Sequence, residues 1–293
     1  MKKQTAILLL IIVTIIWGGG FVAIKLALDY GVSAGMLNMI RGLIFTVIVF
    51  AIFPKQVLGM SKAQLTNGLL VGLFNFLGFI LQAVGAMYTT PSNSSFLTTT
   101  NVVMVPFLAW ILYKNKPKPR NIVAVFVCMA GMAILTDIMN TGFQMNVGDI
   151  YTIAGALGFG LSIVLLAKQP EGGHFAAGAF LLGLTLFLGG AFYMVCFEDV
   201  SFAAVNWKAA TLPIIYLAVG SNFIAQSMQI VAQRHLSAST ASLVMMLEGV
   251  FGSVFSILFG FEKFTTGLLT GGGLILVSLI ISEVQLIKAK KTE

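Results

Sequence analysis

The sequence predicts an all-α polytopic membrane protein, in which ten transmembrane helices form two inverted five-helix repeats. Three observations predict it: the composition, a stretch that returns at a fixed spacing, and the placement of the basic residues. Of 293 residues, 58% are hydrophobic and 9% are charged, far from the roughly 45–50% apolar and 25% charged residues of soluble domains. Because a bilayer-spanning helix needs about 20 residues, the chain has room for roughly ten such helices with short connections and no sizeable soluble domain.

The stretch from Asn75 to Lys116 returns without a gap from Asn222 to Lys263, a shift of 147 residues (222 − 75). Identical residues at this shift include the pairs Phe76 and Phe223, Gln82 and Gln229, Val84 and Val231, Ser92 and Ser239, Ser95 and Ser242, Val103 and Val250. An ungapped match that keeps polar residues inside apolar runs indicates duplication. A duplicated hydrophobic half is typical of a transporter.

The apolar runs give the helices in order. The first repeat, residues 5–137, is expected to hold helices at 5–28, 33–53, 65–88, 91–113 and 119–137. A polar break around Asn140 to Asn146 precedes the second repeat, residues 147–287, with helices at 147–168, 174–196, 209–232, 238–260 and 264–287. All spans should be helical, since a backbone in lipid must satisfy its own hydrogen bonds. Thr90 before Pro91 predicts a helix N-cap, and Ser237 holds the equivalent place.

Positive charge sets the expected orientation, because cytoplasmic connections carry an excess of Lys and Arg. With the N-terminus in the cytoplasm, thirteen of the seventeen basic residues fall inside: Lys2, Lys3, Lys55, Lys62, Lys114, Lys116, Lys118, Arg120, Lys168, Arg234, Lys288, Lys290 and Lys291. Both termini are therefore expected in the cytoplasm. Because each half has an odd number of helices, the second half must enter the membrane in the opposite sense to the first.

Amide side chains recur inside the spans. Asn222, Gln226 and Gln229 stand at i, i+4 and i+7 on one face of the eighth predicted helix, and Asn75 and Gln82 share a face of the third. Amides that face lipid are costly, so both faces should point into the bundle. Two interpretations stay open: the amides line a path for a solute, or they hydrogen-bond neighbouring helices and hold the bundle together.

Glu248 lies near the middle of the ninth predicted helix among apolar neighbours. A carboxyl group inside a span is expensive and signals function, so Glu248 is a candidate for proton coupling. The alternatives are a structural ion pair, with Lys25 or Arg41 as partner, and a protonated acid bonded to a neighbouring helix. The equivalent of Glu248 in the first repeat is Asn101.

Arg41 stands about eight residues into its span (41 − 33), too deep to reach the headgroups easily, so an inward role is expected. Lys25, one turn from Asp29, reaches them more readily. Together the two bases would make an outer vestibule attractive to carboxylates. Trp17 precedes the glycines Gly18 to Gly20, whose spacing is not that of a phosphate loop and favours close helix packing or a hinge.

The sequence gives no reason to expect a cofactor or a metal. Cys128 and Cys196 fall in separate apolar runs, and His174 and His235 lie in separate loops without acidic companions. The net charge of +7 comes from the topology signals, so no nucleic-acid partner is expected. The expected partners are a small-molecule substrate and the lipid bilayer, and a homo-oligomer is left open.

Three stretches resemble a known family. WGGGFVAIK, from Trp17 to Lys25, is similar to the first-helix signature of the ten-helix EamA family in the drug/metabolite transporter superfamily. SFLTTTNVVMVPFLAWILYKNKPKP, from Ser95 to Pro119, resembles its first-repeat motif. ASLVMMLEGVFGSVFSILFGFEKFT, from Ala241 to Thr265, resembles its second-repeat motif.

The resemblance implies two five-helix repeats around a central cavity that transports small metabolites, amino acids or drugs, commonly outward. This chain departs from the family at two places. Gly249 stands where proline often follows the glutamate, which implies a ninth helix without a kink. Asn115 and Lys116 stand where an acid is common, which puts symmetric gating in question.

Together, these observations predict a non-enzymatic secondary transporter of the bacterial cytoplasmic membrane that exports a small amphipathic metabolite, amino acid or drug-like compound by alternating access. Neutral amides, one acid and two bases suit a zwitterion better than a simple cation. The residues expected to line or gate the path are Trp17, Arg41, Asn75, Gln82, Asn101, Asn222, Gln226, Gln229 and Glu248. The alternatives are a nucleotide-sugar or phosphorylated-metabolite exchanger, which would need further basic residues, an integral membrane enzyme, and a non-transporting scaffold.

Overall fold

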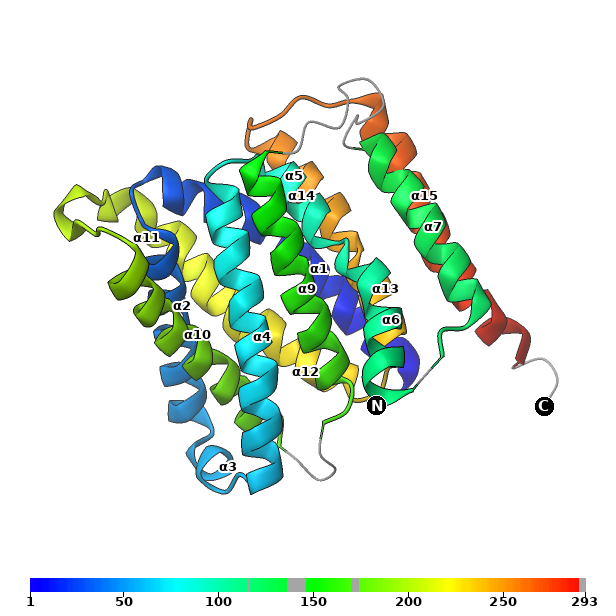
Figure 1. Cartoon of the computed structure of the whole chain (residues 1–293), viewed down its shortest axis with the longest axis horizontal. Coiled ribbons are helices and arrows are strands. Elements are labelled where there is room, and N and C mark those ends of the chain that lie inside the picture. The colour runs from blue at the N-terminus through cyan, green and yellow to red at the C-terminus, as the bar shows by residue number, and fades with distance from the viewer. Residues whose placement is uncertain (115, 136–145, 170–173, 290–293) are drawn as a thin grey trace.

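The computed structural model describes residues 1–114, 116–135, 146–169 and 174–289, and the regular elements of these residues are helical. Figure 1 shows them as a bundle of long helices. The elements of the first half are α1 (Lys3–Asp29), α2 (Ala34–Ile52), α3 (Pro54–Leu58), α4 (Lys62–Ala86), α5 (Pro91–Thr98), α6 (Asn101–Tyr113) and α7 (Pro119–Leu135). Those of the second half are α9 (Val147–Leu166), α10 (Phe175–Phe197), η1 (Phe202–Ala204), α11 (Trp207–Ile215), η2 (Tyr216–Gln226), α12 (Ser227–Gln233), α13 (Ala238–Met245), α14 (Leu247–Leu258) and α15 (Thr266–Ala289).

Eight segments of the described chain are long and apolar enough to cross a membrane, and α7 contains a shorter apolar helix, Pro119–Gly131. The 24-residue helix α15 brings the series to the ten spans predicted from the sequence. The observed ends lie within about three residues of the predicted ones. Asn115, Lys290, Lys291 and most of the expected break at 140–146 lie outside the described residues.

Both predicted caps are confirmed. The Thr90 side chain accepts a hydrogen bond from the Asn93 backbone N–H, with Pro91 in the first turn of α5. The Ser237 side chain accepts from the Thr240 N–H at the start of α13. Each cap satisfies a backbone donor that has no partner within its helix.

The fourth and ninth spans are each broken near the middle, which the sequence did not predict. The first break lies at Thr99 and Thr100, between α5 and α6, and the second at Met246, between α13 and α14. Adding the repeat shift to Thr99 gives Met246 (99 + 147), so the two breaks are equivalent. The ninth span is therefore interrupted at Met246 although Gly249 replaces proline. The Gly249 N–H bonds to the Met246 carbonyl at 3.1 Å, a tight i→i−3 turn that interrupts the α-helical ladder.

Close helix packing, expected at the glycines after Trp17, is confirmed at Gly18. A Cβ atom added to Gly18 would lie 2.5 Å from the Cβ of Phe251 and 2.9 Å from the Gly252 nitrogen. Helices α1 and α14 can thus approach only because residue 18 has no side chain. Elsewhere α7 and α15 pack chiefly against each other, at one side of the bundle in Figure 1.

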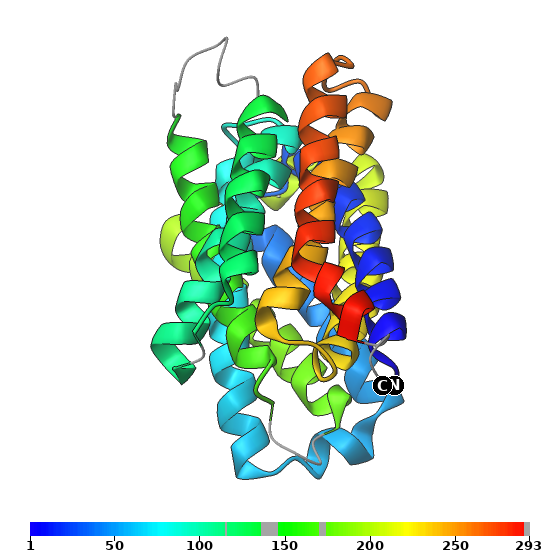
Figure 2. The same ribbon diagram turned by 90° about the vertical axis from the view of Figure 1, so that its right-hand side faces the viewer.

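The two ends of the bundle carry opposite charges. We call the end where α1 begins the basic end, because Lys3, Lys116, Lys118, Arg120 and Lys168 line a surface cavity of about 470 Å³ there. The other is the acidic end, where Asp149, Glu198 and Glu262 bond to the starts of helices. Figures 1 and 2 place the beginning of α1 and the end of α15 at the same end of the bundle. This agrees with an even number of spans, and the cytoplasmic location of that end stays a prediction.

Candidate functional site

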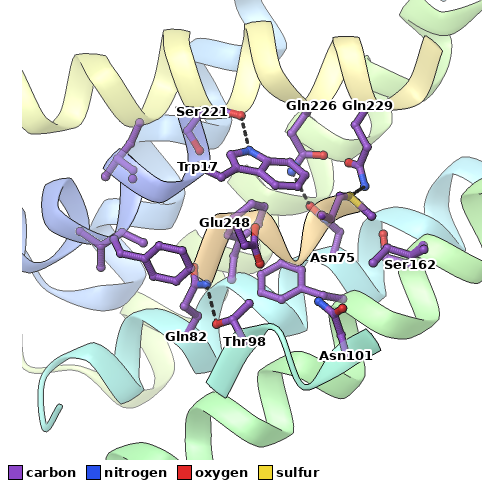
Figure 3. Close-up of a pocket in the computed structure, with 18 of the residues that line it drawn as sticks. Trp17, Asn75, Gln82, Thr98, Asn101, Ser162, Ser221, Gln226, Gln229 and Glu248 are labelled. Atoms are coloured by element: carbon purple, nitrogen blue, oxygen red, sulfur yellow. Dashed lines mark hydrogen bonds between the residues drawn. The ribbon is translucent and has the colours of Figure 1, made fainter. Parts of the chain in front are cut away.

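A narrow cavity lies among residues from the middle of most of the long helices (Figure 3). Its volume of about 50 Å³ is enough for a few water molecules, at roughly 10–15 Å³ each on this measure. Eight of the nine residues predicted to line the path border this cavity: Trp17, Arg41, Asn75, Gln82, Asn101, Gln226, Gln229 and Glu248. The structure therefore brings together residues that the sequence could only place on separate helices.

Glu248 is 5% exposed and lies in the first turn of α14, directly after the break at Met246. The first turn of a helix has free N–H groups and the positive end of the helix dipole, which favour an acidic side chain. Within the described part of the chain, its carboxyl group has no hydrogen bond and no salt bridge, so the alternative of a structural ion pair with Lys25 or Arg41 does not hold there. Glu248 therefore borders the cavity as an acid without a protein partner.

Asn101, the equivalent of Glu248 in the first repeat, begins α6 directly after the other break. Its Oδ1 atom is buried and has no hydrogen-bond partner. Each repeat thus sets one polar side chain at the start of the second piece of a broken helix. One of these side chains can be charged and the other is neutral, which makes the pair chemically asymmetric.

The amide side chains connect helices across the cavity (Figure 3). Gln226 Nε2 donates to Asn75 Oδ1 at 3.1 Å and Gln82 Nε2 donates to Thr98 Oγ1 at 3.1 Å. Gln229 Nε2 lies 3.5 Å from the Met245 sulfur. The same side chains therefore border the cavity and join neighbouring helices, and their role in a path for a solute stays a prediction.

Asn222 is the predicted residue that does not border the cavity. It is 1% exposed, and both polar atoms of its amide lack partners. The reason is the π-helical turn of η2, whose hydrogen bonds span one residue more than those of an α-helix. The wider turn brings Leu217, Ser221 and Gln226 to the cavity, whereas the α-helical period would set Leu217 on the face opposite Gln226. The expected alignment of Asn222, Gln226 and Gln229 on one α-helical face is therefore corrected.

Arg41 is fully buried and borders the central cavity, which confirms its inward position. Its Nε and Nη2 atoms donate to Asn38 Oδ1 at 3.1 and 2.6 Å, and its guanidinium carbon lies 4.1 Å from the centre of the Phe79 ring. Lys25 does not border the cavity: its Nζ atom lies 3.5 Å from Asp29 and 3.4 Å from the Ala86 carbonyl oxygen. The two bases are thus separated and do not form the outer vestibule expected from the sequence.

Several cavity residues were not predicted. The polar ones are Thr98, Ser162 and Ser221, and the rings are Phe21, Phe79 and Phe159. Single hydroxyls in apolar helices commonly bond to their own backbone, as Thr98 does to Ser94 at 2.8 Å, so they gave no distinct signal. The phenylalanines could not be singled out among 24. Trp17 was singled out, and its Nε1 donates to the Ser221 carbonyl at 3.1 Å.

Apolar side chains close the cavity toward the basic end. We call this set the basic-end plug: Leu10, Val105, Ala109, Ile163, Leu236 and Met245. Ile163 and Met245 border the central cavity, and Ala109 and Leu236 border the surface cavity at the basic end. One thin apolar layer therefore separates the two cavities.

A second apolar cluster closes the cavity toward the acidic end. This acidic-end plug contains Ile24, Ala27, Met36, Ala86, Ile214 and Leu217, of which Ile24 and Leu217 border the cavity. Two carboxylate groups also form hydrogen bonds at this end. Glu198, after α10, accepts from the Ser33 hydroxyl at 2.5 Å and from the Gly35 N–H at 2.9 Å, both at the start of α2. Glu262, after α14, accepts from the Thr90 hydroxyl at 2.5 Å.

A central cavity lined by both polar and apolar side chains, in a bundle of long apolar helices, agrees with the comparison to known families. The sequence profile described as the EamA-like transporter family matches residues 4–137 and matches again at residues 146–283. The chain belongs to the EamA-like transporter family. This EamA-like transporter is accordingly a multi-pass membrane protein, and transport is the activity that its family and relatives share.

Similar proteins carry transporter names. An Archaeoglobus fulgidus protein named an uncharacterized transporter is 30% identical to this EamA-like transporter over 284 residues, 96% of this chain and 86% of the relative. A mouse protein named solute carrier family 35 member F2 is 26% identical over 191 residues, 62% of this chain and 50% of the mouse protein. A solved structure titled only as a crystal structure superposes with a TM-score of 0.75 at 16% identity, covering 98% of this chain and 99% of the other. This last likeness concerns the fold alone.

Proposed function

We propose that this EamA-like transporter is a secondary transporter that moves a small amphipathic metabolite, amino acid or drug-like compound across a bacterial cytoplasmic membrane by alternating access. The observation that carries the proposal is the central cavity, in which Glu248 and several amides face aromatic rings between two apolar plugs. Polar groups of this kind in the middle of a bundle are expensive unless they bind something. A small solute with both polar and apolar parts matches the cavity wall.

Alternating access is supported by the equivalence of the two broken spans. A domain organisation of two inverted five-helix repeats, at residues 5–137 and 147–287, would relate the breaks at Thr99 and Met246 by a two-fold axis in the membrane. Movements at one break would then mirror movements at the other. Opening the basic-end plug in one state and the acidic-end plug in the other would expose Asn101 and Glu248 to the two sides in turn.

Outward transport is supported by the difference between the two ends. At the basic end, the neighbouring residues Ile163 and Val164 border the central and the surface cavity respectively, so a small shift would join these cavities. At the acidic end, carboxylate hydrogen bonds hold the plug closed. If the basic end is cytoplasmic, as its charges favour, the solute enters from the cytoplasm and leaves outward.

The test uses purified full-length protein in liposomes preloaded with an equimolar mixture of the twenty proteinogenic amino acids. Efflux is followed by mass spectrometry in wild type, Glu248→Gln and a control, Asp29→Asn. Asp29 is an acid half exposed at the end of α1, outside the cavity. We expect at least one amino acid to leave faster than from protein-free liposomes, with Glu248→Gln impaired and the control unchanged. If every amino acid leaves no faster than it leaves protein-free liposomes, the transport of amino acids is refuted.

A further inference from the structure

Arg41 carries an unbalanced charge in the wall of the central cavity. The side chain is 0% exposed, and its Nη1 atom has no hydrogen-bond partner among the residues that the structure describes. A buried cation is strongly unfavourable unless an anion or several hydrogen bonds compensate it. Asn38 supplies only one neutral oxygen and Phe79 only a ring face, so the compensation inside the protein is incomplete.

No acid whose side chain the structure describes pairs with Arg41. Asp149, Glu198 and Glu262 bond to helix starts at the acidic end, and Asp29 pairs with Lys25. Glu248 borders the same cavity but makes no salt bridge with Arg41 among the described residues. One cation and one acid thus border one cavity without pairing with each other.

Other buried atoms in the cavity wall also lack partners, and all of them are acceptors. These are Asn101 Oδ1 and Gln226 Oε1. Asn101 follows the break in the first repeat as Glu248 follows the break in the second. Among the described residues that border the cavity, Arg41 is thus a cationic donor without an anion, and Asn101, Gln226 and Glu248 carry acceptors without a donor. Arg41 Nη1, Asn101 Oδ1 and Gln226 Oε1 are buried within the wall.

We propose that Arg41 binds the carboxylate of a zwitterionic substrate through Nη1, while the substrate's ammonium group is received by Glu248, Asn101 and Gln226. The proposal rests on the transport function above and names its substrate class: compounds that carry both a carboxylate and an ammonium group, as α-amino acids do. A carboxylate balances the Arg41 charge, and an ammonium group supplies donors to the unpartnered oxygens. Phe21, Phe79 and Phe159 contact the apolar remainder.

Asn38 is the positioning residue for Arg41. Its Nδ2 atom donates to the Ala34 carbonyl at 2.8 Å, which fixes the orientation of the amide and directs Oδ1 toward the guanidinium. With Nε–H and one Nη2–H bonded to Oδ1, the two N–H groups of Nη1 and the second N–H of Nη2 are left for the substrate. Lysine could not reproduce this arrangement, because its single ammonium group lacks the planar set of donors.

The binding test measures the thermal unfolding midpoint of the purified full-length protein with matched compounds. Leucine, methionine and valine are each compared with their amides, which lack the carboxylate, and with their deaminated acids, which lack the ammonium group. A ligand that binds only the folded state raises the midpoint. We expect at least one amino acid to raise it, and its amide and deaminated acid to raise it by less than a third as much at equal concentration.

The variants separate binding from structural support. Arg41→Gln should abolish the amino-acid shift, and Arg41→Lys, which keeps the charge, should weaken the apparent affinity at least tenfold. Lys25→Gln is the matched control, because Lys25 is basic but lies outside the cavity, and it should keep the full shift. If Arg41→Gln does not fold, the Arg41→Lys result decides alone.

Three outcomes overturn the inference: no shift with any of the three amino acids, an equal shift with an amide, or an unchanged amino-acid shift in Arg41→Lys. Efflux from liposomes distinguishes this failure from failure of transport itself. A wild-type protein that exports the amides as fast as the amino acids would still be a transporter without a carboxylate receptor. A protein that exports neither class of compound would overturn this inference together with the proposed transport of amino acids.

Discussion

Gln226 on η2 donates a hydrogen bond of 3.1 Å to Asn75 on α4, which joins the two halves of the chain across the central cavity. Asn75 is 5% exposed and Gln226 is 1% exposed, so water cannot easily replace either partner. The Oε1 atom of Gln226 stays unpartnered at the same place. The bond therefore joins the two halves and leaves Gln226 Oε1 without a donor among the described residues.

Replacing Gln226 by Leu should destabilise the protein, because it leaves Asn75 without its donor. We expect a loss of about 0.5–1.5 kcal/mol, the range of hydrogen bonds between helices in membranes. Unfolding in increasing fractions of denaturing detergent measures it. In a double-mutant cycle, Asn75→Leu together with Gln226→Leu should cost less than the sum of the single changes. Strict additivity would show that the bond contributes nothing.

Replacing Glu248 by Gln should slow substrate efflux from liposomes roughly tenfold or more, equivalent to about 1.4 kcal/mol. If Glu248 carries the proton, the residual efflux should also lose its response to an imposed pH gradient, because glutamine cannot be protonated in this range. Efflux rates with and without the gradient measure both effects. Asp29→Asn, outside the cavity, should behave as wild type. If efflux by the Glu248→Gln protein still responds to the pH gradient, Glu248 does not couple transport to protons.

Replacing Gly18 by Val should destabilise the bundle by about 1–3 kcal/mol, as overpacking generally does. The new Cβ would lie 2.5 Å from the Phe251 Cβ and force α1 away from α14. Gly273→Ala on α15 is the control, because nothing lies within 4 Å of an added Cβ there. Equal unfolding midpoints for the two variants would contradict the close approach.

Replacing both Glu198 and Glu262 by Ala should loosen the acidic end. The change removes hydrogen bonds to Ser33, Gly35 and Thr90, worth about 1 kcal/mol each. The fraction of the protein that is open at the acidic end should therefore rise several-fold. Maleimide labelling of Ile214→Cys in the acidic-end plug measures the opening, in a background with Cys128 and Cys196 changed to Ser. Asp199→Asn, one residue beyond Glu198, serves as the control. Labelling rates that match the control would show that these bonds do not close this end.

The orientation can be tested in intact cells with the same cysteine-free background. Lys208→Cys, in the first turn of α11 at the acidic end, should react with a membrane-impermeant maleimide. Lys62→Cys, at the start of α4 on the basic end, should react only after the cells are permeabilised, because basic residues favour the cytoplasm. The reverse pattern would place the basic end outside and turn the proposed direction around.

Much of the site could be chosen from the sequence, because Glu248, Gln226 and Arg41 are too polar to face lipid and had to point into the bundle. Which inward-facing residues meet was not predictable. The sequence allowed Arg41 and Lys25 to act together, but the structure sets Arg41 beside Phe79 in the cavity and Lys25 beside Asp29 outside it. The partners come from helices far apart in the chain, and helical periodicity carries no information about neighbours.

The membrane class, the helical spans, the caps at Thr90 and Ser237 and the internal repeat could be predicted from the sequence alone. These features depend on local properties: apolar length, capping chemistry and a fixed repeat shift. The folded structure was needed to show that Asn222 lies off the cavity, that both broken spans place a polar residue at a helix start, and that no described acid pairs with Arg41. The reason is that the π-helical turn of η2 and the close approaches of glycine-bearing helices are set by packing across the bundle, where side chains distant in sequence compete for the same space.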